Sequence, residues 1–336
     1  MIYGELGATG LKTSIIGIGS GGPSRLGLAY GHSRANALAL LRRGLECGIN
    51  FFDTAPTYGT ESIIGDAVKD CRSKVILSTK AALGPHFGPF DNSRLALRLS
   101  ARIGEETSFV LSAGALERRV NSSLRRLNTD YIDVLHLHTV TPGQYTNALD
   151  RLVPTLHRLK ENGKIRCIGI TEAFGRDRNH LMLTRAVGAR AFDCIMIGFN
   201  CFYHAGSPLG AEAKHRGIGV VGMHAMRGLG SKESVQGHMN KLVTRGLLIK
   251  TQANAEMLLR VLNEHGIATL AEAAFRFARH ELPADVVLTG TGSMRHLESN
   301  ILACEAGPLP EIITLKIRQL FNNKTVTVDE LRVLGI

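Results

Sequence analysis

Four ionisable side chains stand at or near the ends of apolar runs, in a pattern that suits proton transfer. The stretch NFFDTAPTYG (residues 50–59) ends an apolar run in Asp53 and carries Tyr58 in the loop that follows. The next two apolar runs end in Lys80 and His138. A tyrosine has an ordinary pKa of about 10, and a nearby ammonium lowers that pKa by favouring the phenolate. The four residues therefore predict a tyrosine general acid, supported by the lysine and the aspartate, with the histidine orienting a carbonyl oxygen.

The elements that must position these side chains alternate regularly along the chain. The predicted strands span residues 15–19, 50–54, 75–80, 131–138, 166–171, 194–199, 219–224 and 286–290. The predicted helices span residues 33–47, 60–70, 112–127, 145–162, 176–187, 208–216, 269–280 and 294–306. Eight such units predict a parallel α/β fold. A (β/α)8 TIM barrel fits best, and a doubly wound open sheet is the alternative.

Four segments exceed a minimal barrel, although nothing divides residues 1–336 into more than a single domain. We expect an N-terminal hairpin over residues 1–14 and a C-terminal helical tail over residues 308–336. A Gly/Pro/Arg loop covers residues 81–111, and a basic insertion covers residues 225–265. In a TIM barrel the active site lies where the strands end. Taken singly, each of the four side chains could serve as a helix cap, an ion-pair partner or a packing residue. Together at one barrel mouth, they favour a catalytic site.

The composition restricts the possible partners. The net charge is +11, yet aromatic residues make up 5% of the chain, tryptophan is absent and no nucleic-acid-binding motif is visible, which argues against nucleic acid. The excess charge suits an anionic cofactor or substrate. Arg94, Arg98 and Arg102 would share one helix face, either as a solvated basic surface or as an attraction for an acidic substrate. Without a signal peptide or a membrane-spanning apolar stretch, we expect a cytoplasmic protein that does not bind membranes.

The stretch GINFFDTAPTYGTESIIGDAV resembles the aldo-keto reductase pattern of Gly-Ile-Asn followed by Asp, Thr and Tyr-Gly. The resemblance extends over LGATGLKTSIIGIGS (6–20), LSTK (77–80), LRRLNTDYIDVLHLH (124–138), GKIRCIGIT (163–171) and TGTGSMRHLESN (289–300). It implies that Asp53, Tyr58, Lys80 and His138 form a catalytic tetrad. The implied reaction is hydride transfer between nicotinamide C4 and the carbonyl or alcohol carbon of an aldehyde, ketone or sugar, with Tyr58 as general acid or base.

The resemblance also implies how a cofactor binds, with departures at the nicotinamide. Many members of the family hold the carboxamide with a Ser-Asn pair and a Gln, whereas the matching positions here are Thr171, Glu172 and Met196. Phe199 takes the place of the stacking tyrosine. An ionised Glu172 beside the nicotinamide would favour the oxidised ring and alcohol oxidation. Alternatively, its side chain points away and pairs with an arginine.

A glycine-containing block after the eighth predicted strand suits phosphate at a helix start. Arg295 or His296 would meet a 2′-phosphate there, so NADP is expected and NAD is possible. Residues 223–229 would pass over the pyrophosphate. The full set of predicted cofactor contacts is Gly19, Ser20, Thr171, Glu172, Met196, Phe199, Met223, Arg227, Gly290, Thr291, Gly292, Arg295 and Asn300.

Three rival functions fit parts of the sequence. His136 and His138 would serve a zinc hydrolase, but further strand-end ligands are not evident, so no metal is expected. Lys80 would serve a Schiff-base lyase, although the cofactor blocks argue against it. A regulatory subunit that binds the cofactor with little turnover fits the changed carboxamide residues, whereas the complete tetrad favours an enzyme acting on a small carbonyl or alcohol.

Overall fold

Eight parallel strands close into a barrel, so the predicted TIM barrel is confirmed and the open sheet is wrong. The computed structural model describes residues 1–85, 98, 99, 102, 109–246, 248, 250 and 254–321. In barrel order the strands are β3 (Ile16–Gly19), β4 (Phe51–Asp53), β5 (Ile76–Ala82), β6 (Ile132–Val140), β7 (Ile165–Glu172), β8 (Cys194–Gly198), β9 (Gly219–Met223) and β10 (Val286–Thr289). Pairing of β10 with β3 closes the ring. These strands nearly coincide with the predicted ones because each is a short apolar run.

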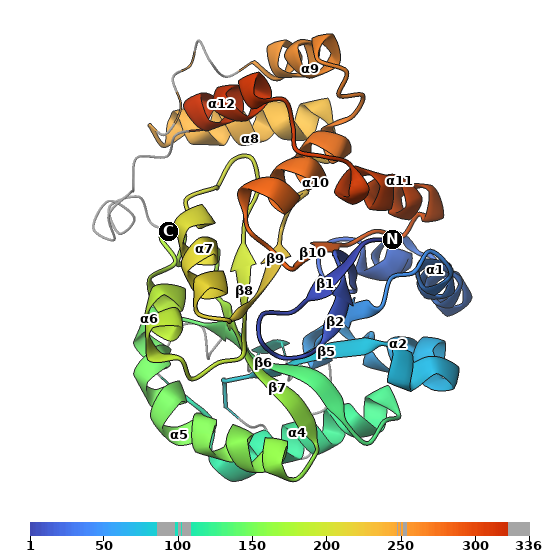
Figure 1. Ribbon diagram of the computed structural model, residues 1–336, viewed down its shortest axis with the longest axis vertical. Coiled ribbons are helices and arrows are strands. Elements are labelled where there is room, and N and C mark those ends of the chain that lie inside the picture. The colour runs from blue at the N-terminus through green and yellow to red at the C-terminus, as the bar shows by residue number, and fades with distance from the viewer. Residues whose placement is uncertain are drawn as a thin grey trace.

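Helices surround the barrel (Figure 1). They are α1 (Arg34–Glu46), α2 (Glu61–Val68), α4 (Ala113–Leu127), α5 (Pro142–Glu161), α6 (Leu181–Ala189), α7 (Ser207–His215), α10 (Leu270–Glu281) and α11 (Met294–Glu305). Two of them begin elsewhere than predicted. Helix α5 begins earlier, where Thr141 and Gln144 form a capping box. Helix α6 begins only at Leu181, because the Asp177 carboxylate accepts hydrogen bonds from its first two N–H groups.

The two extensions beyond the barrel contain helices in the described part of the chain. The insertion after β9 contains α8 (Lys232–Thr244) and α9 (Ala255–Glu264), whereas the sequence predicted only a basic insertion there. The tail contains α12 (Glu311–Leu320), as predicted, and residues 322–336 lie outside the described part. Figure 1 shows α8, α9 and α12 gathered together beyond α10, away from the strands.

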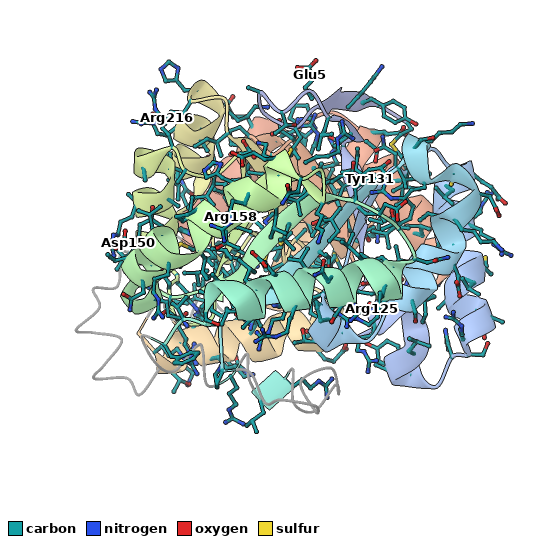
Figure 2. All side chains as sticks on the ribbon, turned by 90° about the horizontal axis from the view of Figure 1, so that it is seen from below. Glu5, Arg125, Tyr131, Asp150, Arg158 and Arg216 are labelled. Carbon is teal, nitrogen blue, oxygen red and sulfur yellow. The ribbon has the colours of Figure 1, made fainter. Side chains whose placement is uncertain are left out.

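The end of the barrel where the strands begin is closed by the predicted hairpin. Its strands are β1 (Tyr3–Glu5) and β2 (Lys12–Ser14), and Leu6 and Leu11 between them pack into the apolar cluster inside the barrel. At Gly7 a Cβ atom would lie 2.3 Å from the backbone nitrogen of Gly219, so only glycine allows this approach. Figure 2 shows Glu5, Tyr131 and Arg216 toward this same end. A site must therefore form at the opposite mouth.

The barrel interior is layered because alternate residues of each strand point inward. The lower layer is apolar and consists of Phe51, Ile76, Val134, Cys167, Cys194, Met196, Val221 and Val286, together with the two hairpin leucines. Residues further along the same strands are polar and buried, namely Asp53, Ser78, Lys80, His136, His138 and Thr171. The polar layer thus rests on an apolar floor that keeps water from reaching it from below.

Candidate active site

A buried ion pair forms the base of the site. Lys80 on β5 places Nζ 2.6 Å from each carboxylate oxygen of Asp53, the last residue of β4. The same ammonium donates to the carbonyl oxygen of Thr54 at 2.8 Å, and Ser78 Oγ donates to Asp53 Oδ1 at 2.8 Å. Lys80 is 2% exposed and Asp53 is 3% exposed. Since an ammonium has three donors, these contacts fix its position.

Burial shifts the pKa of Asp53 and the pKa of Lys80 in the direction that favours the neutral form of each side chain. It raises the pKa of Asp53, and the Lys80 ammonium and the Ser78 hydroxyl offset part of that rise. It lowers the pKa of Lys80, and Asp53 again offsets part of the change. Each ion therefore depends on its partner to remain charged in this layer.

Tyr58 lies directly over the lysine. It is the last residue of the short 3₁₀ helix η2 (Pro56–Tyr58), which ends at Gly59 in the left-handed conformation (φ +71°). Lys80 Nζ lies 5.3 Å from the centroid of the Tyr58 ring, and the His138 ring meets it edge-on at 6.0 Å between centroids. A phenol held beside an ammonium and an imidazole is the arrangement predicted for a tunable proton donor.

Hydroxyl groups beneath the tyrosine loop hold it to the barrel. Ser20 Oγ donates to the carbonyl oxygen of Asp53 at 3.0 Å and lies 2.7 Å from Thr60 Oγ1. Thr60 Oγ1 also lies 2.9 Å from Thr54 Oγ1, and Arg25 Nε donates to the carbonyl oxygen of Tyr58 at 3.1 Å. Ser20 is fully buried. In the structure its hydroxyl ties the Tyr58 loop to the barrel, and its predicted contact with a cofactor stays a prediction. No sequence pattern indicated its partner Thr60.

His138 is neutral at ordinary pH. Burial, and secondly the Lys80 charge, lower its pKa to about 3. The residue after it, Thr139, has a left-handed backbone (φ +51°), and its N–H donates to Thr171 Oγ1 at 2.8 Å. Thr171 was predicted to hold the cofactor, and in the structure its oxygen accepts from the backbone that places His138. His136 is fully buried one layer deeper, in the barrel interior.

Glu172 does not reach the barrel interior. Its Oε1 accepts from the Gly198 N–H at 2.7 Å, and its Oε2 lies 2.8 Å from His180 Nδ1. Burial raises the pKa of Glu172. Burial also acts to lower the pKa of His180, but the carboxylates of Glu172 and Asp177 outweigh it and raise that pKa. The alternative of an outward side chain therefore holds, with histidine rather than arginine as partner, and the expected charge beside the nicotinamide is corrected.

Two further predicted contacts on β8 and beyond are packed into the core. Met196 is 1% exposed and belongs to the apolar floor. Phe199 is also 1% exposed, and its ring stacks on Phe277 of α10 at 5.7 Å and 17°. The structure thus places the Phe199 ring in the core, and its predicted contact with a cofactor stays a prediction. Met223, at the end of β9, is half-buried and contacts the apolar floor from above.

The loops after β3 and β10 meet backbone to backbone. A Cβ atom at Gly290 would lie 3.4 Å from the carbonyl oxygen of Gly19, and one at Gly292 would lie 2.4 Å from Gly27 Cα. Helix α11 begins directly afterwards, with Arg295 exposed in its first turn and no acidic residue there. Such a helix start, reached through glycines, fits an anionic group.

Three of the remaining residues predicted to contact a cofactor differ in burial. Asn300 is buried and its amide donates to Thr289 Oγ1 at 2.8 Å, so it ties α11 to the end of β10. Thr291 is buried, and its Oγ1 accepts from the Ser293 N–H at 3.1 Å. Arg227 is exposed on the loop after β9, where its N–H donates to the carbonyl oxygen of His224. Thr291 and Arg227 thus lie on the loops after β10 and β9, and Asn300 lies on α11.

A cavity of about 550 Å³ opens beside the tetrad. Tyr58 and His138 both line it. The full lining is Gly22, Arg25, Thr57, Tyr58, Arg98, Arg102, His138, Thr139 and Arg176. This volume is typical of sites for small molecules. The side chains suited to proton transfer therefore face a space that a small substrate fits.

Two structural features are absent from the described residues. Within that part of the chain, no three or more His, Cys, Asp or Glu side chains gather in a way that could hold a metal ion. The described helices also include none that is both long and apolar enough to span a bilayer.

The protein is therefore a TIM barrel that places a tyrosine, a neutral histidine and a buried lysine–aspartate pair at one cavity. The sequence model of the Aldo/keto reductase family matches residues 16–320. The chain belongs to this family, and the resemblance seen in the sequence is confirmed.

Its relatives are oxidoreductases of differing activity. The chain is 35% identical to L-galactose dehydrogenase of Arabidopsis thaliana over 173 residues, which cover 49% of this chain and 47% of the relative. It is 30% identical to the NADH-specific methylglyoxal reductase of Escherichia coli over 189 residues, 52% of each chain. These alignments span about half the length of the relatives. An aldo-keto reductase from Bacillus halodurans, in its holo form, has the same fold, with a TM-score of 0.67, 23% identity and coverage of 95% of this chain and 96% of that chain.

Proposed function

We propose that this protein is a nicotinamide-dependent oxidoreductase that interconverts a carbonyl compound and its alcohol. The observation that carries the proposal is the buried Lys80–Asp53 pair directly beneath Tyr58, at the cavity that His138 also lines. Such a buried pair is costly to maintain, because each ion loses its hydration. Because the pair lies directly under the Tyr58 phenol, we infer that it serves the proton chemistry of that phenol.

The residues divide the proton chemistry among them. Tyr58 donates a proton to the carbonyl oxygen in reduction and accepts it in oxidation. The Lys80 ammonium stabilises the phenolate that results, and Asp53 keeps that ammonium charged and in place. His138, whose pKa of about 3 leaves it neutral, orients the oxygen by a hydrogen bond without competing as an acid.

A bound nicotinamide would supply or accept the hydride at C4. The chain's own residues fit such a group at the mouth between β3 and β10, where glycine backbones meet and α11 presents its N-terminus. Arg295 and His296 in the first turn favour a 2′-phosphate, so NADP is the proposed cofactor and NAD the alternative. One relative is named for NADH specificity, which keeps that alternative in view.

A panel of aldehydes, ketones, sugars and alcohols tests the proposal, with NADP(H) and NAD(H) in both directions. We expect loss of reduced-cofactor absorbance with at least one carbonyl. Tyr58→Phe removes only the phenolic oxygen and is expected to lower kcat by about 10²–10⁴-fold while cofactor affinity, measured by calorimetry, stays the same. Cofactor binding without turnover of any member of the panel would instead support the regulatory-subunit alternative.

A further inference from the structure

We propose that helix α8 and the loops after β7 and β9 together bind a phosphate group at a cluster of four cations around one histidine. The histidine is His238 of α8, and the cations that act on it are Arg178, Arg227, Lys241 and Arg245. We call these five side chains the α8 cluster. It is separate from the arginines that the sequence spaces by four, of which Arg94 lies outside the described residues.

Contacts of His238 with two loops bring the α8 cluster together. The His238 ring meets the Tyr203 ring edge-on at 5.5 Å between centroids. Arg178, in the loop after β7, lies with Cζ 4.4 Å from the centroid of the same tyrosine ring, and its Nη1 donates to the Tyr203 hydroxyl at 2.8 Å. A Cβ atom at Gly228, the residue after Arg227, would lie 3.2 Å from His238 Nδ1. The helix and both loops therefore meet at this histidine.

The other two cations follow His238 along one side of α8. Lys241 and Arg245 stand three and seven residues after it, which is the spacing of side chains on one helix face. The helix dipole accounts for a cation in the last turn of α8. It does not account for Arg178 and Arg227, because these reach the same histidine from other segments. Convergence from three segments is the feature that indicates a binding site.

The charge of the α8 cluster has no carboxylate partner in the described part of the chain. None of its four cations forms an ion pair with a described aspartate or glutamate. Burial lowers the pKa of Arg178, Tyr203 opposes that change, and the charges of Arg245 and Arg227 add to it. A bound anion would relieve this repulsion, and guanidinium groups suit phosphate in particular. Arg227 and Lys241 are exposed, so the anion can enter from solvent.

His238 makes the binding depend on pH. Burial, followed by the charges of the four cations, lowers the pKa of His238 to about 4. Its Nε2 is buried without a hydrogen-bond partner. An anion within the α8 cluster would offset the cationic charge and raise the pKa of His238. Binding is then accompanied by proton uptake, so affinity for the anion increases as pH falls toward that of the free histidine.

Sulfate tests the α8 cluster, because it is a tetrahedral dianion whose charge does not change over this pH range. Calorimetry should give a Kd at about pH 5.5 that is at least about threefold lower than at about pH 8. His238→Gln should still bind sulfate and lose this pH dependence. Arg227→Gln and Arg245→Gln should each raise the Kd at least about threefold. Arg42→Gln should leave it unchanged, since it removes the same charge from α1, which Figure 1 shows well apart from α8.

Competition with NADH identifies where the phosphate group comes from. Arg227 is the only member of the α8 cluster that the sequence predicted to contact a cofactor. If saturating NADH displaces sulfate, and Arg245→Gln weakens NADH binding, the α8 cluster holds the pyrophosphate of the cofactor. If sulfate binds equally well to the NADH-saturated protein, the α8 cluster holds a separate phosphate-bearing ligand. Either result supports the site.

Three results would overturn the inference: no sulfate binding, a loss of affinity in Arg42→Gln equal to that in Arg245→Gln, or equal affinity at the two pH values. Proton NMR of wild type gives a second measurement in case His238→Gln does not fold. The titration midpoint of the assigned His238 ring resonance should rise when sulfate is added, and an unchanged midpoint would also overturn the inference. None of these readouts uses turnover. The proposed function can therefore fail, with neither NADH binding nor carbonyl reduction, while sulfate still decides the site.

Discussion

Separating the two ions of the central pair should produce variants with opposite pH dependence of stability. Lys80→Met leaves Asp53 buried without its cation, and Asp53→Asn leaves Lys80 buried without its anion. Breaking a buried pair from one side costs about 3–5 kcal/mol, because the remaining charge is unpaired. Replacing both, as Asp53→Leu with Lys80→Met, removes the unpaired charge and should recover most of that loss. The double variant is therefore expected to be more stable than either single one.

The sign of each pH effect follows from the direction of the pKa shifts. Burial raises the pKa of Asp53, so in Lys80→Met the folded protein holds a proton that the unfolded chain releases above about pH 4. Its free energy of unfolding should fall as pH rises from that value through the folded pKa of Asp53. Burial lowers the pKa of Lys80, so in Asp53→Asn the unfolded chain binds the extra proton. Its free energy of unfolding should rise as pH increases toward about 10.

Urea unfolding followed by circular dichroism at several pH values provides the measurement, since the chain has no tryptophan. All three variants should lose turnover, because each disturbs the ammonium beneath Tyr58. Parallel pH profiles for the two single variants, or a double variant less stable than both, would refute the reasoning from burial.

Further predictions concern single positions. The rate of carbonyl reduction should show no step from His138 between about pH 5 and 8, because its pKa of about 3 lies below that range; a pH–rate profile of wild type and His138→Gln checks this. Glu172→Gln should leave the ratio of oxidised to reduced cofactor affinity unchanged, since its carboxylate contacts His180 and Gly198 rather than the interior; a tenfold change in that ratio, measured by calorimetry, would contradict the geometry. Gly21→Ala should lower kcat, because its Cβ would lie 2.6 Å from the Tyr58 ring; a variant with wild-type kcat would show that the loop adjusts.

The fold and the tetrad were predictable because both depend on local patterns. Each barrel strand is a short apolar run. Asp53 is the last residue of β4, and Lys80 and His138 each lie two residues before the ends of β5 and β6. Parallel strands bring their ends to one mouth, so naming the strands was enough to bring three of the four side chains together. Tyr58 follows from its distance beyond Asp53 through a turn that proline and glycine define. None of this required knowledge of how the loops pack.

The loop partners could not be predicted, because they depend on tertiary contacts. The hydroxyl groups of Ser20 and Thr60 meet only when the loops after β3 and β4 are already packed. Arg25 reaches the carbonyl oxygen of Tyr58 across the same contact. The lining of the cavity is similar, since its arginines come from three separate segments of the chain that meet only at the mouth. A pattern within one segment, such as the arginines spaced by four, indicated a basic face without showing what it faces.

For the residues predicted to contact the nicotinamide, by contrast, the sequence already indicates which side chains point inward. Adjacent residues of a strand point to opposite faces, so Thr171 and Glu172 on β7 cannot both face the interior. Thr171 points inward, and Glu172 accordingly pairs with His180 on the outer side. The same rule separates Met196, in the apolar floor, from Phe199 three positions on, in the outer core. A family pattern transfers residue types by position, but strand alternation decides which of them a cofactor can meet. Many members of the family hold the nicotinamide carboxamide with Asn and Gln side chains. In this protein, a side chain that takes over that contact must belong to an inward-pointing strand residue or to a loop above the strands.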